Sequence, residues 1–202
     1  GLFYSSRGLA HLLKNRNSLV KEVLIISPSH YYPLRENEIL FSPFESYETP
    51  LGNLKALKND FSDKREQIKR AFESEHAIEM ILLAVAYLQN RQNEAIKITT
   101  ALLNSITDEA SLKAIAAQIN EVIEVKKETL IIASSDFTRY GRNCSYTPFG
   151  KNVDENVLEE VKISDLNVGS LLKESNYEKL IEAMKKRSYT ICGLSGATIA
   201  SY

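Results

Sequence analysis

The sequence predicts an α/β fold in which a central mixed sheet is flanked by helices. Three short runs, at 22–27, 95–100 and 129–134, are rich in apolar and β-branched residues and are typical of strands. Segments with the apolar spacing of amphipathic helices lie before, between and after these runs. Strands that alternate with helices in this way form parallel or mixed sheets, with helices on both faces.

The N-terminal part of the chain is expected to form a helix, a strand and a loop. The serines at 5–6 are candidate caps for a helix with an apolar face at 9–13. The strand at 22–27 is expected to end at Pro28, which has no backbone N–H to donate to a neighbouring strand. His30 is therefore predicted to lie on a loop just beyond the carboxyl end of this strand.

The rest of the first half is expected to contain one long connection and two helices. Residues 31–62 hold most of the prolines and are predicted to be irregular, apart from one short strand at 38–41. Helices are expected at 63–72 and 77–89, the second with a broad apolar stripe. Long connections of this kind are often functional.

The second half continues the alternation of helices and strands. An acidic first turn favours a helix at 108–122, which leads into the strand at 129–134. The glycines and the proline of 140–153 predict a second loop. Helices are expected at 155–161 and 177–186.

Composition limits the class of protein. The 202 residues, 44% of them hydrophobic, suit one domain spanning 1–202. The formal charge of -1 provides no general attraction for nucleic acid or for a membrane surface, so neither is expected as a partner. The longest apolar run, at 78–88, is too short to cross a membrane. Cys144 and Cys192 suit free thiols in a reducing compartment, and a cytoplasmic location is expected.

Polar clusters follow the predicted strands and helices. In parallel sheets, ligands usually bind beyond the carboxyl ends of the strands. Three clusters, at 28–30, 134–141 and 191–193, follow such elements, and a fourth at 75–79 opens a helix. His30 is a candidate metal ligand or general base, because imidazole is a common metal ligand with a pKa near neutrality. The structural alternative is a loop histidine bonded to the backbone.

Three further residues are candidates for chemistry, and each has a structural alternative. Cys192 is a thiolate ligand or nucleophile, or else a small buried apolar residue. Asp136 binds a substrate or orients a histidine, or else caps the turn at 134–135. His76 belongs to the site, or else pairs with Glu79 or a neighbouring carboxylate.

Taken in order, these clusters resemble the Memo family, which occurs in animals as a mediator of cell motility and in bacteria and archaea as a companion of radical-SAM proteins. The resemblance extends over almost the whole chain. The matching stretches are Gly1-Leu-Phe-Tyr-Ser-Ser, Pro28-Ser-His30, Tyr47-Glu-Thr-Pro-Leu-Gly52, Glu75-His-Ala-Ile-Glu79, Ser134-Ser-Asp-Phe137, Tyr140-Gly141 and Ile191-Cys-Gly193.

The resemblance implies a fold similar to that of class III extradiol dioxygenases, and a pocket that binds iron or copper through two histidines and a cysteine. His30 and Cys192 match the second histidine and the cysteine. The first histidine belongs to a His-Ala-Gly motif whose glycine corresponds to Gly1, so we expect this sequence to begin inside a longer chain. Asp136 matches the family's pocket aspartate, and His76 matches the histidine of its Glu-His motif.

The sequence departs from the family pattern at Arg139, where the family has a pocket histidine. Arginine is a permanent cation that can bind a carboxylate or phosphate through paired hydrogen bonds. An arginine at this position therefore predicts an anionic substrate or ligand.

Two functions are compatible with these residues. The first is a metal-dependent redox enzyme in which His30 and Cys192 hold an iron or copper ion, while the catalytic residues His76 and Asp136 position the reacting groups of a small-molecule or peptide substrate. The second is a metal-free pocket that recognises a peptide or small anion through Arg139 and the loop near Tyr47. Animal members of the family are linked to phosphopeptide-type partners, and the bacterial and archaeal members imply a radical-SAM partner protein.

Overall fold

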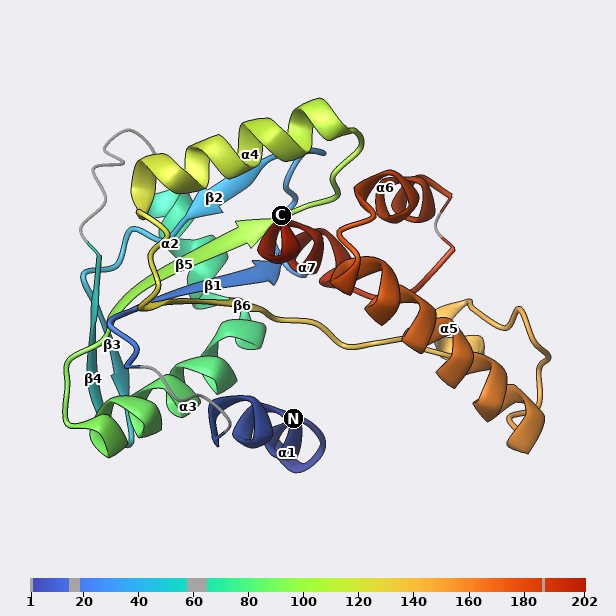
Figure 1. The fold of residues 1–202 in the computed structure, drawn as a ribbon, viewed down its shortest axis with the longest axis horizontal. Helices are drawn as coiled ribbons and strands as arrows, with labels where there is room; N and C mark the ends of the chain where they lie inside the picture. The colour runs from blue at the N-terminus through green and yellow to red at the C-terminus, as the bar shows by residue number, and fades with distance from the viewer. Residues whose placement is uncertain (1, 15–18, 58–64, 187) are drawn as a thin grey trace.

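The computed structural model describes residues 2–14, 19–57, 65–186 and 188–202. Within these ranges, helices and strands follow one another along the chain and form the arrangement shown in Figure 1. In chain order the elements are α1 (Leu2–Lys14), β1 (Glu22–Pro28), β2 (Ile39–Phe41), β3 (Ser46–Thr49), β4 (Gly52–Ala56), α2 (Arg65–Glu73), α3 (His76–Gln92), β5 (Lys97–Leu103), α4 (Glu109–Val122), β6 (Thr129–Ala133), the short 3-10 helix η1 (Arg142–Cys144), α5 (Glu155–Lys173), α6 (Tyr177–Lys185) and α7 (Leu194–Ser201).

The described strands form one mixed sheet of six, in the order β3-β4-β5-β1-β6, with β2 paired to β5 beside this path. The central strand β1 is parallel to both of its neighbours, β5 and β6, and β4 is also parallel to β5. Strands β2 and β3 are antiparallel to their partners. The predicted fold class, α/β with a mixed sheet flanked by helices, is confirmed.

Helices cover both faces of the sheet (Figure 1), and β1 is buried between them. Alternate side chains of a strand point to opposite faces. Val23 and Ile25 join a core on the face that α3 covers. Leu24 and Ile26 join a second core, which includes α4 and Ile199 of α7. The short apolar run therefore forms a strand buried on both sides, as its pattern predicts.

The predicted cap of the first helix is wrong. The helix α1 begins at Leu2, so the serines at 5–6 lie within it and do not cap it. The helix α1 packs against α3. Most helical stability in proteins comes from packing of this kind, which outweighs a capping preference of about 1 kcal/mol.

The connection at 31–62 is more regular than predicted. The short strand expected at 38–41 is present as β2, but the hairpin of β3 and β4 was not predicted. Its signal is weak because Leu54 is the one fully buried residue of the two strands. The turn is tight: Thr49 Oγ1 donates to the Gly52 carbonyl at 2.7 Å, and Gly52 has a φ of +123° that suits glycine.

The helix α5 is longer than the predicted segment 155–161 and continues to Lys173. Its second half is held by packing, because Val168 and Leu171 share a core with Leu180 of α6 and with α7. None of the described helices, α5 included, is long and apolar enough to span a membrane.

Candidate functional site

Three segments from distant parts of the chain meet at the carboxyl end of the central strands (Figure 1). β1 and β6 are parallel neighbours, so the segments that follow them, 28–30 and 134–139, lie at the same end of the sheet. The segment 191–193 joins them because α7 packs on both strands. Gly196 permits this close approach, since a Cβ there would lie 3.1 Å from Cγ2 of Ile26.

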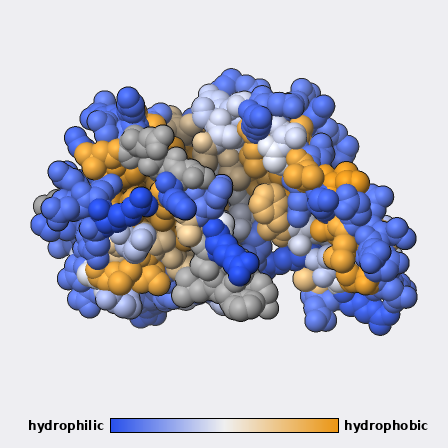
Figure 2. Space-filling model, turned by 60° about the horizontal axis from the view of Figure 1, so that its bottom comes forward, coloured by the Kyte–Doolittle hydropathy of each residue, from blue (hydrophilic) through white to orange (hydrophobic). Residues whose placement is uncertain are grey.

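Two adjoining cavities lie at this end of the sheet. The larger, about 630 Å³, is formed by residues that follow β1 and β5 and by the start of α7. The smaller, about 430 Å³, lies between α1, the start of α3 and the segment after β6. His30 and Cys192 line both cavities, and His76, Asp136 and Arg139 line the smaller one. Figure 2 shows one face of the molecule. This face is hollowed between the part that contains the sheet and the part that contains α5.

The buried carboxylate of Glu75 holds His30 at the edge of these cavities. Glu75 Oε2 accepts a hydrogen bond from the His30 backbone N–H at 2.7 Å, and Glu75 Oε1 lies 2.9 Å from His30 Nδ1. Oε1 also accepts a hydrogen bond from the Ala77 N–H at 3.2 Å, so Glu75 caps the start of α3. The sequence placed Glu75 at the start of this helix, where its charge suits the helix dipole, but did not indicate its contact with His30.

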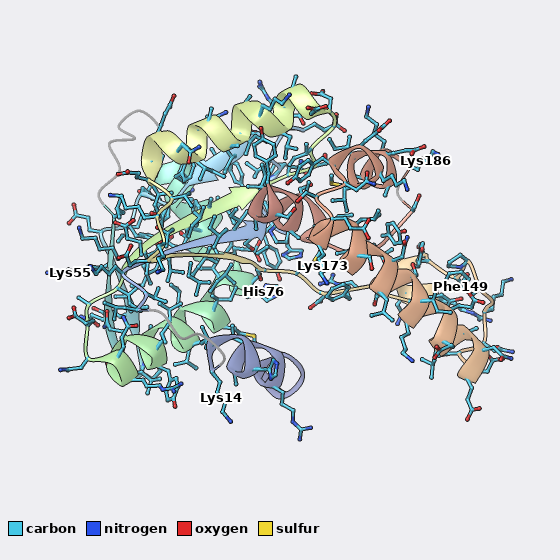
Figure 3. The ribbon with its side chains drawn as sticks, in the orientation of Figure 1. Lys14, Lys55, His76, Phe149, Lys173 and Lys186 are labelled. Carbon is cyan, nitrogen blue, oxygen red and sulfur yellow. The ribbon has the colours of Figure 1, made fainter. Side chains whose placement is uncertain are left out.

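His76 lies at the start of α3, where Figure 3 labels it. The two imidazole rings are stacked with centroids 5.6 Å apart and an interplanar angle of 29°. The ring of Tyr31 lies edge-on, 5.7 Å from that of His76. The nearest carboxylate is Glu75, whose Oε1 is 3.7 Å from His76 Nδ1. The structure thus brings the two predicted histidines together.

Cys192 faces the segment after β6. Its Sγ accepts a hydrogen bond from the Asp136 backbone N–H at 3.3 Å. The Asp136 carboxylate does not orient a histidine; its Oδ2 instead accepts hydrogen bonds from Arg139 Nε at 3.1 Å and Arg139 Nη2 at 2.7 Å. These bonds raise the pKa of the Arg139 guanidinium, and the nearby thiol of Cys192 adds a smaller contribution. The cation at position 139 is therefore already partnered.

Thr190 connects the two segments and was not predicted. Its Oγ1 accepts a hydrogen bond from the Arg139 N–H at 2.8 Å and donates one to the Arg139 carbonyl at 2.7 Å. The hydroxyl of a single side chain therefore fixes the loop of Arg139 against the chain that leads to Cys192. No motif in the sequence indicated this pairing, because the two residues lie on different elements.

The donor atoms present suit a soft or borderline metal ion only in part. Imidazole and thiolate are donors that iron and copper accept. Within the described ranges, however, no group of three or more His, Cys, Asp or Glu side chains is arranged to hold a metal ion. His30 and Cys192 therefore supply two of the three ligands that the Memo resemblance implies.

Tyr47 lies apart from the other predicted site residues. It belongs to β3, at the opposite edge of the sheet from β6, and lines neither cavity. Its hydroxyl is 2.7 Å from both Ser42 Oγ and Thr100 Oγ1, and its ring packs against the core under α3. Tyr47 thus contributes to the packing and hydrogen bonding of the sheet, and it does not lie at the site.

Tyr47→Phe is expected to lower the free energy of unfolding by about 1–2 kcal/mol, because the buried hydroxyls of Ser42 and Thr100 lose a partner. Burial raises the pKa of Tyr47 above 10.0, against the opposing effect of its two hydrogen bonds. The folded protein then holds this proton more tightly than the unfolded chain. Its contribution to stability is complete below pH 10.0 and is lost as the pH rises through the folded pKa.

Urea unfolding from neutral pH to above pH 10.0 checks both expectations. The loss of stability at high pH should be smaller in Tyr47→Phe than in the wild type. Tyr87→Phe is the matched control, because this tyrosine is 57% exposed. The free energy of unfolding of this variant should differ from that of the wild type by less than about 0.5 kcal/mol. Equal losses in the two variants would contradict a structural role for the Tyr47 hydroxyl.

Comparison with known proteins finds relatives that match most of this chain. The family model described as Memo-like protein matches residues 1–200. A MEMO1 family protein of Pyrococcus furiosus is 28% identical over 190 residues, which are 91% of this chain and 64% of the relative. The Protein memo-1 homolog of Caenorhabditis elegans is 27% identical over 205 residues, 96% of this chain and 55% of the relative.

A MEMO1 family protein of Saccharomyces cerevisiae is 28% identical over 182 residues, 81% of this chain and 52% of the relative. The chain thus spans less than two thirds of the length of each of these relatives. The family model nevertheless covers nearly all of its residues, including every segment that forms the two cavities. The chain belongs to the Memo-like protein family.

Proposed function

We propose that this protein binds a single iron or copper ion between His30 and Cys192 and uses it for redox chemistry on a small-molecule or peptide substrate in the cytoplasm. The observation that supports this proposal is the convergence of the two side chains. They come from distant parts of the sequence, yet both line the same two cavities. The family relationship supplies the third ligand of the proposal, a histidine that the resemblance places before Gly1.

The chemistry of the proposed site follows from the donor set. One imidazole and one thiolate favour iron or copper over a hard cation such as magnesium. When bound, such an ion supplies redox chemistry at coordination positions that the protein leaves open. The Asp136 N–H donates to Cys192 Sγ and thereby orients the sulfur at the wall of the cavity. His76 and Asp136 line the same cavity as the two ligands, where they can hold a proton or orient a substrate.

Metal analysis of the natural full-length protein tests the proposal. Iron and copper are measured by mass spectrometry after purification of the wild type, His30→Ala and Cys192→Ser. Both variants are expected to lose most of the bound metal, because each lacks one of the few donors. Cys144→Ser is the matched control, since Cys144 is an exposed free thiol that lines neither cavity. Unchanged metal content in both site variants would refute the proposed function.

A second candidate function is metal-free binding of an anion or peptide, and it depends on Arg139. This residue lines the smaller cavity, which favours a role in recognition. Two of its N–H groups already bond to Asp136, however, and this neutralising partner weakens its attraction for a second anion. Titration with inorganic phosphate separates the candidates: binding by metal-free protein that disappears in Arg139→Ala would favour recognition over redox chemistry.

A further inference from the structure

We infer that Glu75 is a positioning residue for His30: it holds the imidazole in the tautomer protonated on Nδ1, so that Nε2 keeps its lone pair for a ligand in the cavities. This inference rests on the proposed function, because the lone pair of His30 Nε2 is the one that would bind the metal ion. It concerns Glu75, which directly precedes His76 in the Glu-His stretch and lines neither cavity.

The hydrogen bonds around Glu75 determine which ring nitrogen carries the proton. An ionised carboxylate has only acceptor atoms. Oε2 accepts from the backbone N–H of His30, and Oε1 accepts from the N–H of Ala77. The 2.9 Å contact between Oε1 and Nδ1 is a hydrogen bond only when Nδ1 carries a proton. The opposite tautomer would place two lone pairs against each other.

Burial makes this arrangement rigid. The side chain of Glu75 is 1% exposed, whereas that of His30 is 23% exposed. Among the described residues, no lysine or arginine forms an ion pair with Glu75, so the carboxylate is compensated by backbone N–H groups, by the start of α3 and by the imidazole. Three donors on two segments fix its oxygens, and the histidine is fixed with them.

The other ring nitrogen is left available. Within the part of the chain that the structure describes, Nε2 of His30 has no hydrogen-bond partner, while the ring lines both cavities. The stacked ring of His76 adds a contact that holds the plane of the imidazole. A histidine that donates its other N–H to a carboxylate is the usual arrangement around a protein-bound metal ion, because the carboxylate fixes the tautomer and makes the ligand more basic.

Glu75→Gln tests the inference because it changes the hydrogen-bond pattern at nearly constant shape. With its oxygen accepting the His30 backbone N–H, the amide directs its NH2 group at Nδ1 and gives up the bond from the Ala77 N–H. The proton of the imidazole should then move to Nε2. We expect copper(II) affinity of the full-length protein to fall roughly 10–100-fold, as is typical when the partner of a metal-bound histidine is lost. Glu79→Gln, which removes the same charge from an exposed position of α3, should change neither property.

Nitrogen-15 NMR of the metal-free protein reads the tautomer directly, because protonated and unprotonated ring nitrogens have different chemical shifts. The spectra are recorded at mildly alkaline pH, because the two tautomers are forms of the neutral ring. His30→Asn identifies the ring signals of His30 by deletion, and His11→Asn and His76→Asn identify those of the other two histidines of this sequence. The wild type should show His30 protonated on Nδ1, and Glu75→Gln should show it protonated on Nε2.

The NMR result separates this inference from the proposed function. A wild-type His30 protonated on Nε2 would overturn the inference whatever the metal content, and this measurement stands even where Glu75→Gln fails to fold. A tautomer that is unchanged in folded Glu75→Gln would overturn it as well. A tautomer that switches in protein that never binds copper would refute the metal site and leave Glu75 as the residue that orients His30.

Discussion

Gly193→Ala is expected to lower the free energy of unfolding by about 3 kcal/mol, at the upper end of the usual cost of overpacking. A Cβ at this position would lie 2.1 Å from the carbonyl oxygen of Ser134 and 2.7 Å from Cβ of Ser135. The first contact is with backbone, which a change of rotamer cannot relieve. The end of β6 or the start of α7 must therefore move, and the Gly193 N–H would lose its bond to Ser135 Oγ, now 3.0 Å.

The same movement would separate the parts of the site, because Cys192 and Asp136 are immediate neighbours of the clashing residues. We expect Gly193→Ala to lose bound metal along with stability. Gly169→Ala is the matched control: Gly169 lies inside α5, and a Cβ there would meet no atom within 4 Å, so alanine should stabilise this helix by about 0.5–1 kcal/mol. Urea unfolding measures the stability of both variants. A Gly193→Ala protein as stable as the wild type would contradict the close contact.

The strands that build the site could be predicted because their signal is local. The run that became β1 is buried on both faces, and a run of this kind is visible in six consecutive residues. The β3–β4 hairpin was missed because its strands pair with each other at the sheet's edge, where only Leu54 is fully buried. Burial that comes from one residue leaves no periodic pattern in the sequence.

Of the residues that form the site, only those that belong to sequence motifs could be predicted. His30 and Cys192 were found because the polar clusters occur in a recognisable order, and the structure brings them to the same cavities. The role of Glu75 was missed because it depends on how the chain after β1 lies against the start of α3. The pairing of Asp136 with Arg139 was missed although they are three residues apart, because the loop conformation that joins them has no periodic signature.

Leu24→Ala is expected to lower the free energy of unfolding by about 2–5 kcal/mol. Leu24 is fully buried in β1, on the face covered by α4 and α7. Removing its side chain leaves a cavity between the sheet and these helices, and β1 cannot move to fill it because β5 and β6 hold it on both sides. Since β1 leads directly to His30, the proposed metal site predicts that the folded variant also binds less metal.

Leu158→Ala separates burial from the chemistry of the substitution, because it removes the same atoms from a leucine that is 57% exposed on α5. Its effect should stay within about 0.5 kcal/mol, as for most surface substitutions. Thermal and urea unfolding of both variants give the comparison. Similar losses of unfolding free energy at the two positions would mean that packing on β1 stabilises the protein no more than an exposed helix face does. The sheet would then not be what holds His30 and Cys192 in place.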